Sequence, residues 1–94
     1  MRYLYIIYSE KRDSYYSGQT KGVDNRVVKH NKGHSLATRG GEPWKLKKVI
    51  EFEIKSEAIK AENWIKRMKS RRVIEQIIAD EINIKEICLE RLSR

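Results

Sequence analysis

Two short segments near the start of the chain have the composition of β-strands. Residues 3–8 and 15–20 are rich in β-branched and aromatic side chains, and a short polar stretch separates them. This close spacing predicts an antiparallel hairpin. A third strand is expected over residues 44–52, where an offset in the alternation of apolar positions, between Leu46 and Val49, indicates a β-bulge.

Most of the remaining chain has apolar residues at the spacing of an α-helix. Residues 23–30 carry apolar positions four apart and are expected to form a helix followed by Gly33, a residue suited to the left-handed conformation. A second helix is expected from Ser56, as its N-terminal cap, to about Lys69. Ser70 is placed to cap a third helix.

The last part of the chain predicts one more helix, over residues 84–92, capped by Asn83. One unbroken helix through Asn83 is the alternative. The apolar side chains of this segment must be buried, either on the domain, which is favoured, or in a dimer contact. They are Ile82, Ile84, Ile87, Leu89 and Leu92.

The predicted order of elements is β-β-α-β-α-α, followed by the last helix. A chain of 94 residues has room for one domain with a modest core. Three strands with helices on one or both faces predict a small α/β fold with a mainly antiparallel sheet.

The charge of the chain favours a polyanionic partner. Lysine and arginine outnumber aspartate and glutamate by 21 to 13, which gives a formal net charge of +8. Nucleic acid is the leading candidate, and general basicity without such a partner is the alternative. No apolar run is long enough for a membrane span and no secretory signal is visible. The low cysteine content suits a reducing compartment, so a cytoplasmic protein is expected. The single cysteine, Cys88, excludes an internal disulfide.

Glu62 is the side chain that packing explains least. On a helical wheel it falls inside the apolar arc that contains Ala58, Ile59 and Ile65. A carboxylate there is partly desolvated, which costs free energy unless the group is paired, hydrogen-bonded or bound to a metal. An ion pair with Lys66, one turn later, is the structural alternative.

Two further groups of residues carry candidate chemistry. Arg26 and His30 are four residues apart and share one helix face, where they can hold a phosphate and transfer a proton; a solvated face is the alternative. Tyr5 and Tyr16 lie on the two strands of the hairpin, where aromatic pairs stabilise a sheet without any chemistry. A phenol beside a cation can instead accept a proton, because positive charge lowers its pKa.

Basic side chains are candidates for contacts with phosphates. The basic run over residues 67–72 is either such a surface or a solvated junction between helices. Another basic position lies in the glycine-containing loop over residues 35–43. The candidate nucleic-acid contacts are Lys29, Arg39, Lys66, Lys69 and Arg71.

Seven short motifs follow one another between residues 2 and 78, and together they resemble the GIY-YIG nuclease family, in its small single-domain bacterial, UPF0213-like branch. The two half-motifs appear as Tyr3-Leu4-Tyr5 and Tyr16-Ser17-Gly18, with Tyr3 where the family usually has glycine and Ser17 in place of isoleucine. The seven motifs are Tyr3–Ile6, Tyr16–Gly18, Arg26–Asn31, Pro43–Leu46, Ser56–Ala58, Glu62–Lys66 and Lys69–Arg71.

The resemblance implies a role for each candidate. Tyr5 corresponds to a general base for the attacking water, and Tyr16 to a tyrosine that positions water or substrate. Arg26 corresponds to a residue that stabilises charge on the phosphate, Glu62 to the single carboxylate that holds a divalent metal, and His30 to a position that assists proton transfer. The implied cofactor is Mg²⁺ or Mn²⁺. Mg²⁺ suits a lone carboxylate because it takes its other ligands from water and the substrate phosphate.

The activity implied by the resemblance is that of a metal-dependent endonuclease that hydrolyses DNA, with branched DNA and repair intermediates among the candidate substrates. A homodimer or an accessory protein is a candidate partner. Residues 1–78 are expected to form the nuclease-like domain, and residues 79–94 a helical extension. A catalytically inactive nucleic-acid-binding module and a structural interaction protein are the alternatives.

Overall fold

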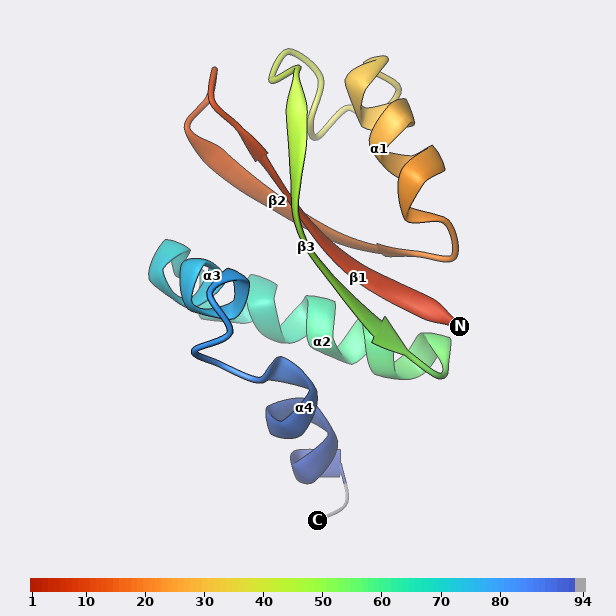
Figure 1. Ribbon diagram of the computed structural model, residues 1–94, viewed down its shortest axis with the longest axis vertical. Coiled ribbons are helices and arrows are strands. Elements are labelled where there is room, and N and C mark those ends of the chain that lie inside the picture. Colours follow the sequence, from red (N-terminus) through yellow and green to blue (C-terminus); the bar gives the residue numbers. More distant parts are fainter. Residues whose placement is uncertain (93–94) are drawn as a thin grey trace.

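The computed structural model describes residues 1–92, with side chains as far as Cys88. Figure 1 shows a three-stranded sheet with helices on both of its faces. The order β-β-α-β-α-α, with one more helix after it, confirms the predicted fold class. The elements are β1 (Arg2–Ser9), β2 (Ser14–Thr20), α1 (Val23–Asn31), β3 (Trp44–Phe52), α2 (Lys55–Met68), α3 (Arg71–Ile78) and α4 (Ile84–Leu92).

β1 is the central strand of the sheet. The strand order is β2-β1-β3, and both neighbours run antiparallel to β1. The predicted hairpin is confirmed, with Tyr5 of β1 paired to Gly18 of β2. The predicted β-bulge is also confirmed: between Ile6 and Ile7 the register on β3 shifts, and Lys47 is left over in the pairing.

Alternation along β1 sends its side chains into two separate cores. Leu4 and Ile6 are buried with apolar residues of α2, α3 and α4. Tyr5 and Ile7 are buried on the other face, against Trp44 of β3 and partly buried residues of β2 and α1. Tyr5 therefore lies on the face that α1 covers (Figure 1).

Two of the three predicted helix caps are present. Ser70 Oγ accepts a hydrogen bond from the backbone N–H of Val73 at 3.2 Å, and Asn83 Oδ1 accepts one from that of Glu86 at 3.1 Å. The alternative of one unbroken helix is wrong, because α3 ends before Asn83 and α4 starts after it. The Ser56 cap is also wrong: the chain is already helical at the preceding residue, so Ser56 lies inside the first turn of α2.

The end of α1 turns the chain back towards the sheet. Gly33 adopts the predicted left-handed conformation, with φ of +76°. The backbone N–H groups of Gly33 and His34 donate to carbonyls in the last turn of α1, each at 3.1 Å. This tight ending lets residues 34–43 return across the end of β1.

α4 begins by packing on the rest of the chain. Ile84 and Cys88 are 1% and 7% exposed and belong to the core that α2 and α3 share with the sheet. Leu89 and Leu92, also expected to be buried, lie outside the described side chains. A domain boundary at residue 78 stays a prediction. Within the part of the chain that the structure describes, no helix is long and apolar enough to cross a membrane.

Candidate active site

The ring of Tyr5 lies directly on the backbone of Gly18, its partner on β2. A Cβ atom at position 18 would come within 2.5 Å of Tyr5 Oη and 2.7 Å of Cζ, closer than real Cβ atoms approach other atoms. Glycine is therefore the residue that fits opposite Tyr5. The contact gives the second half-motif a physical reason to end in glycine, and it helps to fix the phenol, which is only 2% exposed.

A chain of hydrogen bonds leads from Tyr5 into the interior. Tyr5 Oη lies 2.8 Å from His30 Nε2, and the other ring nitrogen, Nδ1, lies 2.7 Å from Thr38 Oγ1. His30 and Thr38 are 1% and 0% exposed, so bulk water does not compete for these bonds. The helix face that Arg26 and His30 were expected to share is divided, because His30 is buried and Arg26 is exposed.

The loop between α1 and β3 holds Thr38 in place. The indole N–H of Trp44 donates to the Thr38 carbonyl at 2.9 Å. Ser9 Oγ donates to the carbonyl of Gly41 at 2.5 Å, and the guanidinium of Arg12 donates to two further loop carbonyls. The loop is therefore tied to β1 and the hairpin turn, and through Thr38 it fixes the orientation of the His30 ring.

Three more predicted site residues lie near enough to Tyr5 to affect its pKa. Tyr16 meets the His30 ring edge-on, with 5.2 Å between ring centroids. The side chain of Glu62 is 17% exposed and pairs with Lys66 at 2.5 Å, as the structural alternative predicted. The charge of Arg26 lowers the pKa of Tyr5, whereas Tyr16 and Glu62 raise it.

The pKa of Tyr5 is raised, and this corrects the expectation of a phenol activated by a nearby cation. Burial is the largest cause, followed by the neighbouring Tyr16. The positive charge of Arg26 lowers the pKa as expected, but it does not outweigh burial, and the Glu62 carboxylate raises the pKa further. The Tyr5 hydroxyl is therefore protonated at neutral pH.

The pKa of His30 moves in the opposite direction. Burial lowers it, and the charge of Arg26 lowers it further. His30 is therefore a neutral imidazole at neutral pH. With one ring nitrogen held by Thr38, the other is placed to accept the proton of the Tyr5 hydroxyl.

The candidate nucleic-acid contacts come from different elements of the fold. Lys29 is exposed on α1, and Arg39 is exposed in the α1–β3 loop, where its Nε donates to a backbone carbonyl at 3.0 Å. Lys66 and Lys69 are exposed at the C-terminal end of α2. Lys66 is the one that adjoins the site, because it pairs with Glu62.

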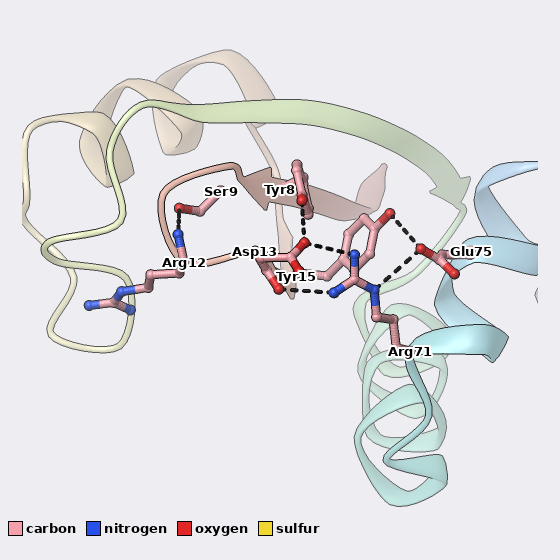
Figure 2. A network of polar contacts seen from close by, with 7 residues as sticks. All are labelled: Tyr8, Ser9, Arg12, Asp13, Tyr15, Arg71 and Glu75. Carbon is pink, nitrogen blue, oxygen red and sulfur yellow. Dashed lines mark hydrogen bonds and ion pairs between the residues drawn. The ribbon is translucent and has the colours of Figure 1, made fainter.

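Arg71 ties the hairpin turn to α3, as Figure 2 shows. Its guanidinium donates to the Asp13 carboxylate at 2.9 Å and to the Asp13 carbonyl at 3.0 Å, and it pairs with Glu75 at 3.3 Å. Tyr8 donates to the same Asp13 carboxylate and Tyr15 to Glu75. Arg71 thus has a structural role, and its contact with nucleic acid stays a prediction.

Glu62 is the residue suited to hold a metal ion. Among the described residues no group of three or more histidine, cysteine, aspartate or glutamate side chains is arranged to hold one. A lone, largely buried carboxylate fits Mg²⁺, which is usually bound through one or two carboxylates together with water and substrate phosphates.

Sequence reasoning missed two residues that build the site. Thr38 is a polar residue in a polar loop, and nothing in the sequence signals that it is fully buried. Asn31 belongs to a recognised motif, but its task was not assigned: its side chain accepts from the backbone N–H of Trp44 at 2.6 Å and donates to the Trp44 carbonyl at 3.2 Å. Both residues join α1 and its loop to the start of β3.

Comparison with known proteins shows the family to which the chain is related. A model of the GIY-YIG catalytic domain matches residues 1–74 of the chain. The chain is 38% identical over 78 residues to the UPF0213 protein BH0048 of Halalkalibacterium halodurans, a match that covers 82% of this chain and 81% of that protein. It is 36% identical over 80 residues to a UPF0213 protein of Natronomonas pharaonis, which covers 84% of this chain and 92% of the relative.

A solved structure has a similar fold. The solution NMR structure of the UPF0213 protein BH0048 from Bacillus halodurans matches with a TM-score of 0.54 and 37% sequence identity. The match covers 84% of each chain. The similarity therefore extends over most of the fold.

Proposed function

The chain belongs to the GIY-YIG family of catalytic domains, a family of nucleases, and we propose that it is a metal-dependent endonuclease that hydrolyses DNA phosphodiester bonds. The observation that carries the proposal is the 2.8 Å contact between Tyr5 Oη and His30 Nε2, beside the charges of Arg26 and Glu62. It supplies a path for a proton next to a place where a phosphate can bind.

Tyr5 is the base that takes a proton from the attacking water. Because its pKa is raised, its hydroxyl can accept that proton only if its own proton leaves. His30 Nε2 accepts the departing proton, since the lowered pKa of His30 keeps the imidazole neutral beforehand. Water thus gives a proton to Tyr5 Oη while Tyr5 Oη gives one to His30.

Arg26 and Tyr16 act on the phosphate and the water. Arg26 carries a fixed positive charge on the exposed side of the site, where it offsets the negative charge that develops on the phosphate oxygens. Tyr16 packs edge-on against His30 and borders the same space, so its hydroxyl positions water or substrate. Neither residue has to move a proton for these tasks.

Glu62 would hold the divalent ion, Mg²⁺ or Mn²⁺. When bound, such an ion polarises a phosphoryl oxygen and neutralises developing charge. Lys66 pairs with Glu62 in the structure. If Glu62 held a metal ion instead, the ammonium group of Lys66 would be free to contact the substrate backbone. Glu62 thus contributes a carboxylate whose orientation α2 fixes.

A cleavage assay tests the proposal. The purified protein is incubated with duplex, single-stranded and branched DNA in Mg²⁺, in Mn²⁺ or in EDTA, and cleavage is expected only with a metal. Glu62→Gln should abolish cleavage, whereas Glu57→Gln, on the same helix, should retain it. Cleavage by Glu62→Gln at the wild-type rate would overturn the metal role. DNA binding without cleavage under any metal would favour an inactive nucleic-acid-binding module.

A further inference from the structure

A cavity beside α2 lies outside the site described so far. Its volume is about 610 Å³, which is within the range of small-ligand sites. The described residues that line it belong to α2 from Lys60 onward, to Lys69 directly after α2, and to α4 at Cys88. Among the described residues that line it, none is acidic. They are Lys60, Asn63, Trp64, Lys66, Arg67, Lys69 and Cys88.

The positive charge of the side chains that line this cavity favours an anionic ligand. Lys60, Arg67 and Lys69 are exposed, and within the described residues none of the three forms an ion pair. Lys60 and Arg67 are seven residues apart, two helical turns, so both project from the same face of α2. From Lys60 to its last residue the helix advances about 12 Å, and Lys69 follows directly as the C-cap, so the cations form a row rather than a point.

Trp64 adds an aromatic surface to this row of cations. It is partly buried, packs against the core and lines the cavity. In the described part of the chain its indole N–H makes no hydrogen bond. A flat aromatic side chain beside cations is the arrangement that proteins use to bind single-stranded nucleic acid, because bases stack on the ring while phosphates meet the charges.

Lys66 connects the cavity to the candidate active site. It lines the cavity, pairs with Glu62 and interacts electrostatically with Tyr16. A nucleic-acid strand whose phosphate lies at Tyr5 and Arg26 can therefore continue past Lys66 into the cavity. The two sites lie along one path.

We propose that the cavity between α2 and α4 binds an unpaired nucleotide of the substrate strand, with its base on Trp64 and flanking phosphates on Lys60, Arg67 and Lys69. The nucleotide must be unpaired because a base inside a duplex cannot leave its partner to stack in a cavity without a cost in free energy. This inference rests on the proposed function, because it takes the DNA strand bound at the candidate active site as the ligand. It assigns to the protein a preference for DNA that is single-stranded beside the cleavage point.

The test measures binding without cleavage. In a Tyr5→Phe background, a labelled single-stranded oligonucleotide and its blunt duplex are titrated by fluorescence anisotropy at several salt concentrations. Lys60→Gln should lower the slope of log affinity against log salt by about 0.7 for the single strand. Lys55→Gln, at the start of the same helix and outside the cavity, should leave that slope unchanged. Equal effects of the two variants, or equal losses for duplex and single strand, would overturn the proposal.

Tryptophan fluorescence supplies a second measurement. Trp44 is only 4% exposed, so quenching by an added single strand reports mainly on Trp64. We expect quenching in the Tyr5→Phe protein and its loss in Trp64→Leu, together with binding that is about fivefold weaker or more. Absence of quenching in the Tyr5→Phe protein would contradict stacking on Trp64.

These outcomes separate the two proposals. If the wild-type protein cleaves no DNA but binding still depends on Lys60 and Trp64, the cavity stands and the nuclease proposal fails. If the protein cleaves DNA but both variants bind and cleave as the wild type does, only the cavity proposal fails.

Discussion

Tyr5 Oη and His30 Nε2 lie 2.8 Å apart, although 25 positions separate the two residues in the chain. Burial raises the pKa of the tyrosine and lowers that of the histidine, so it keeps both groups neutral. One is then a proton donor and the other a ready acceptor. Titratable groups whose environments push their pKa values apart are typical of acid–base sites, and here the pair can relay the proton of an attacking water.

The first prediction concerns pH. DNA cleavage should fall as the pH drops through the pKa of His30, which lies below its ordinary value of 6.5. The protonated imidazole cannot accept the Tyr5 proton, and because burial and Arg26 lower the pKa, activity should persist at pH 6.5 and decline only in more acidic solution. Single-turnover rates across the acidic range measure this.

A matched variant tests the assignment of that acidic limb. His30→Gln does not titrate, so it should reduce the rate and flatten the profile. An acidic limb centred above pH 6.5 in the wild-type protein would contradict the assignment, since it would require a raised pKa.

The second prediction concerns Thr38 as a positioning residue. Thr38→Val keeps the shape but leaves His30 Nδ1 buried without its partner, which should cost about 1–3 kcal/mol of unfolding free energy. It should also lower kcat with little change in KM, because the His30 ring loses its fixed orientation. Thr38→Ser restores the hydroxyl and should recover the rate. Urea denaturation and steady-state kinetics measure the two effects.

A different result would assign Thr38 a purely structural role. In that case Thr38→Val would be destabilised but would cleave DNA at the wild-type rate once folded.

The third prediction concerns Gly18. In Gly18→Ala the new methyl group would overlap the Tyr5 ring, so the ring or the strand must shift. We expect a loss of about 1–3 kcal/mol in unfolding free energy, as for other overpacked sites, together with slower cleavage because Tyr5 moves away from His30. Gly22→Ala is the control, since a Cβ there meets its nearest neighbour at 3.9 Å. Similar stabilities for the two variants would disprove the close contact.

Local features of the fold were predictable because local residues determine them. The hairpin follows from two β-rich segments with a short polar turn, and the caps at Ser70 and Asn83 follow from side chains that bond to backbone groups three residues later. Ser56 does not act as a cap because α2 begins one residue before it, so Ile54 holds the N-cap position and Ser56 lies inside the helix.

The chemistry of the site was predictable only in part. The sequence named Tyr5, Arg26 and Glu62 and predicted the partial burial of Glu62 and its pair with Lys66, but not the environment of Tyr5. The burial of His30 and the raised pKa of Tyr5 depend on the α1–β3 loop closing over the sheet, which Thr38 and its contacts secure. Such long-range packing leaves no periodic signal in the sequence, so the sequence could not show that burial outweighs the charge of Arg26 in setting the pKa of Tyr5.

The most direct test of the proposed mechanism is the single-turnover cleavage rate of Tyr5→Phe in the presence of Mg²⁺. This variant keeps the ring that packs on Gly18 and removes only the hydroxyl that contacts His30. We predict that the rate falls at least about 100-fold, the usual contribution of a general base, while DNA affinity is unchanged. Tyr3→Phe, on the same strand, should cleave DNA at the wild-type rate. Cleavage by Tyr5→Phe at the wild-type rate would contradict the account.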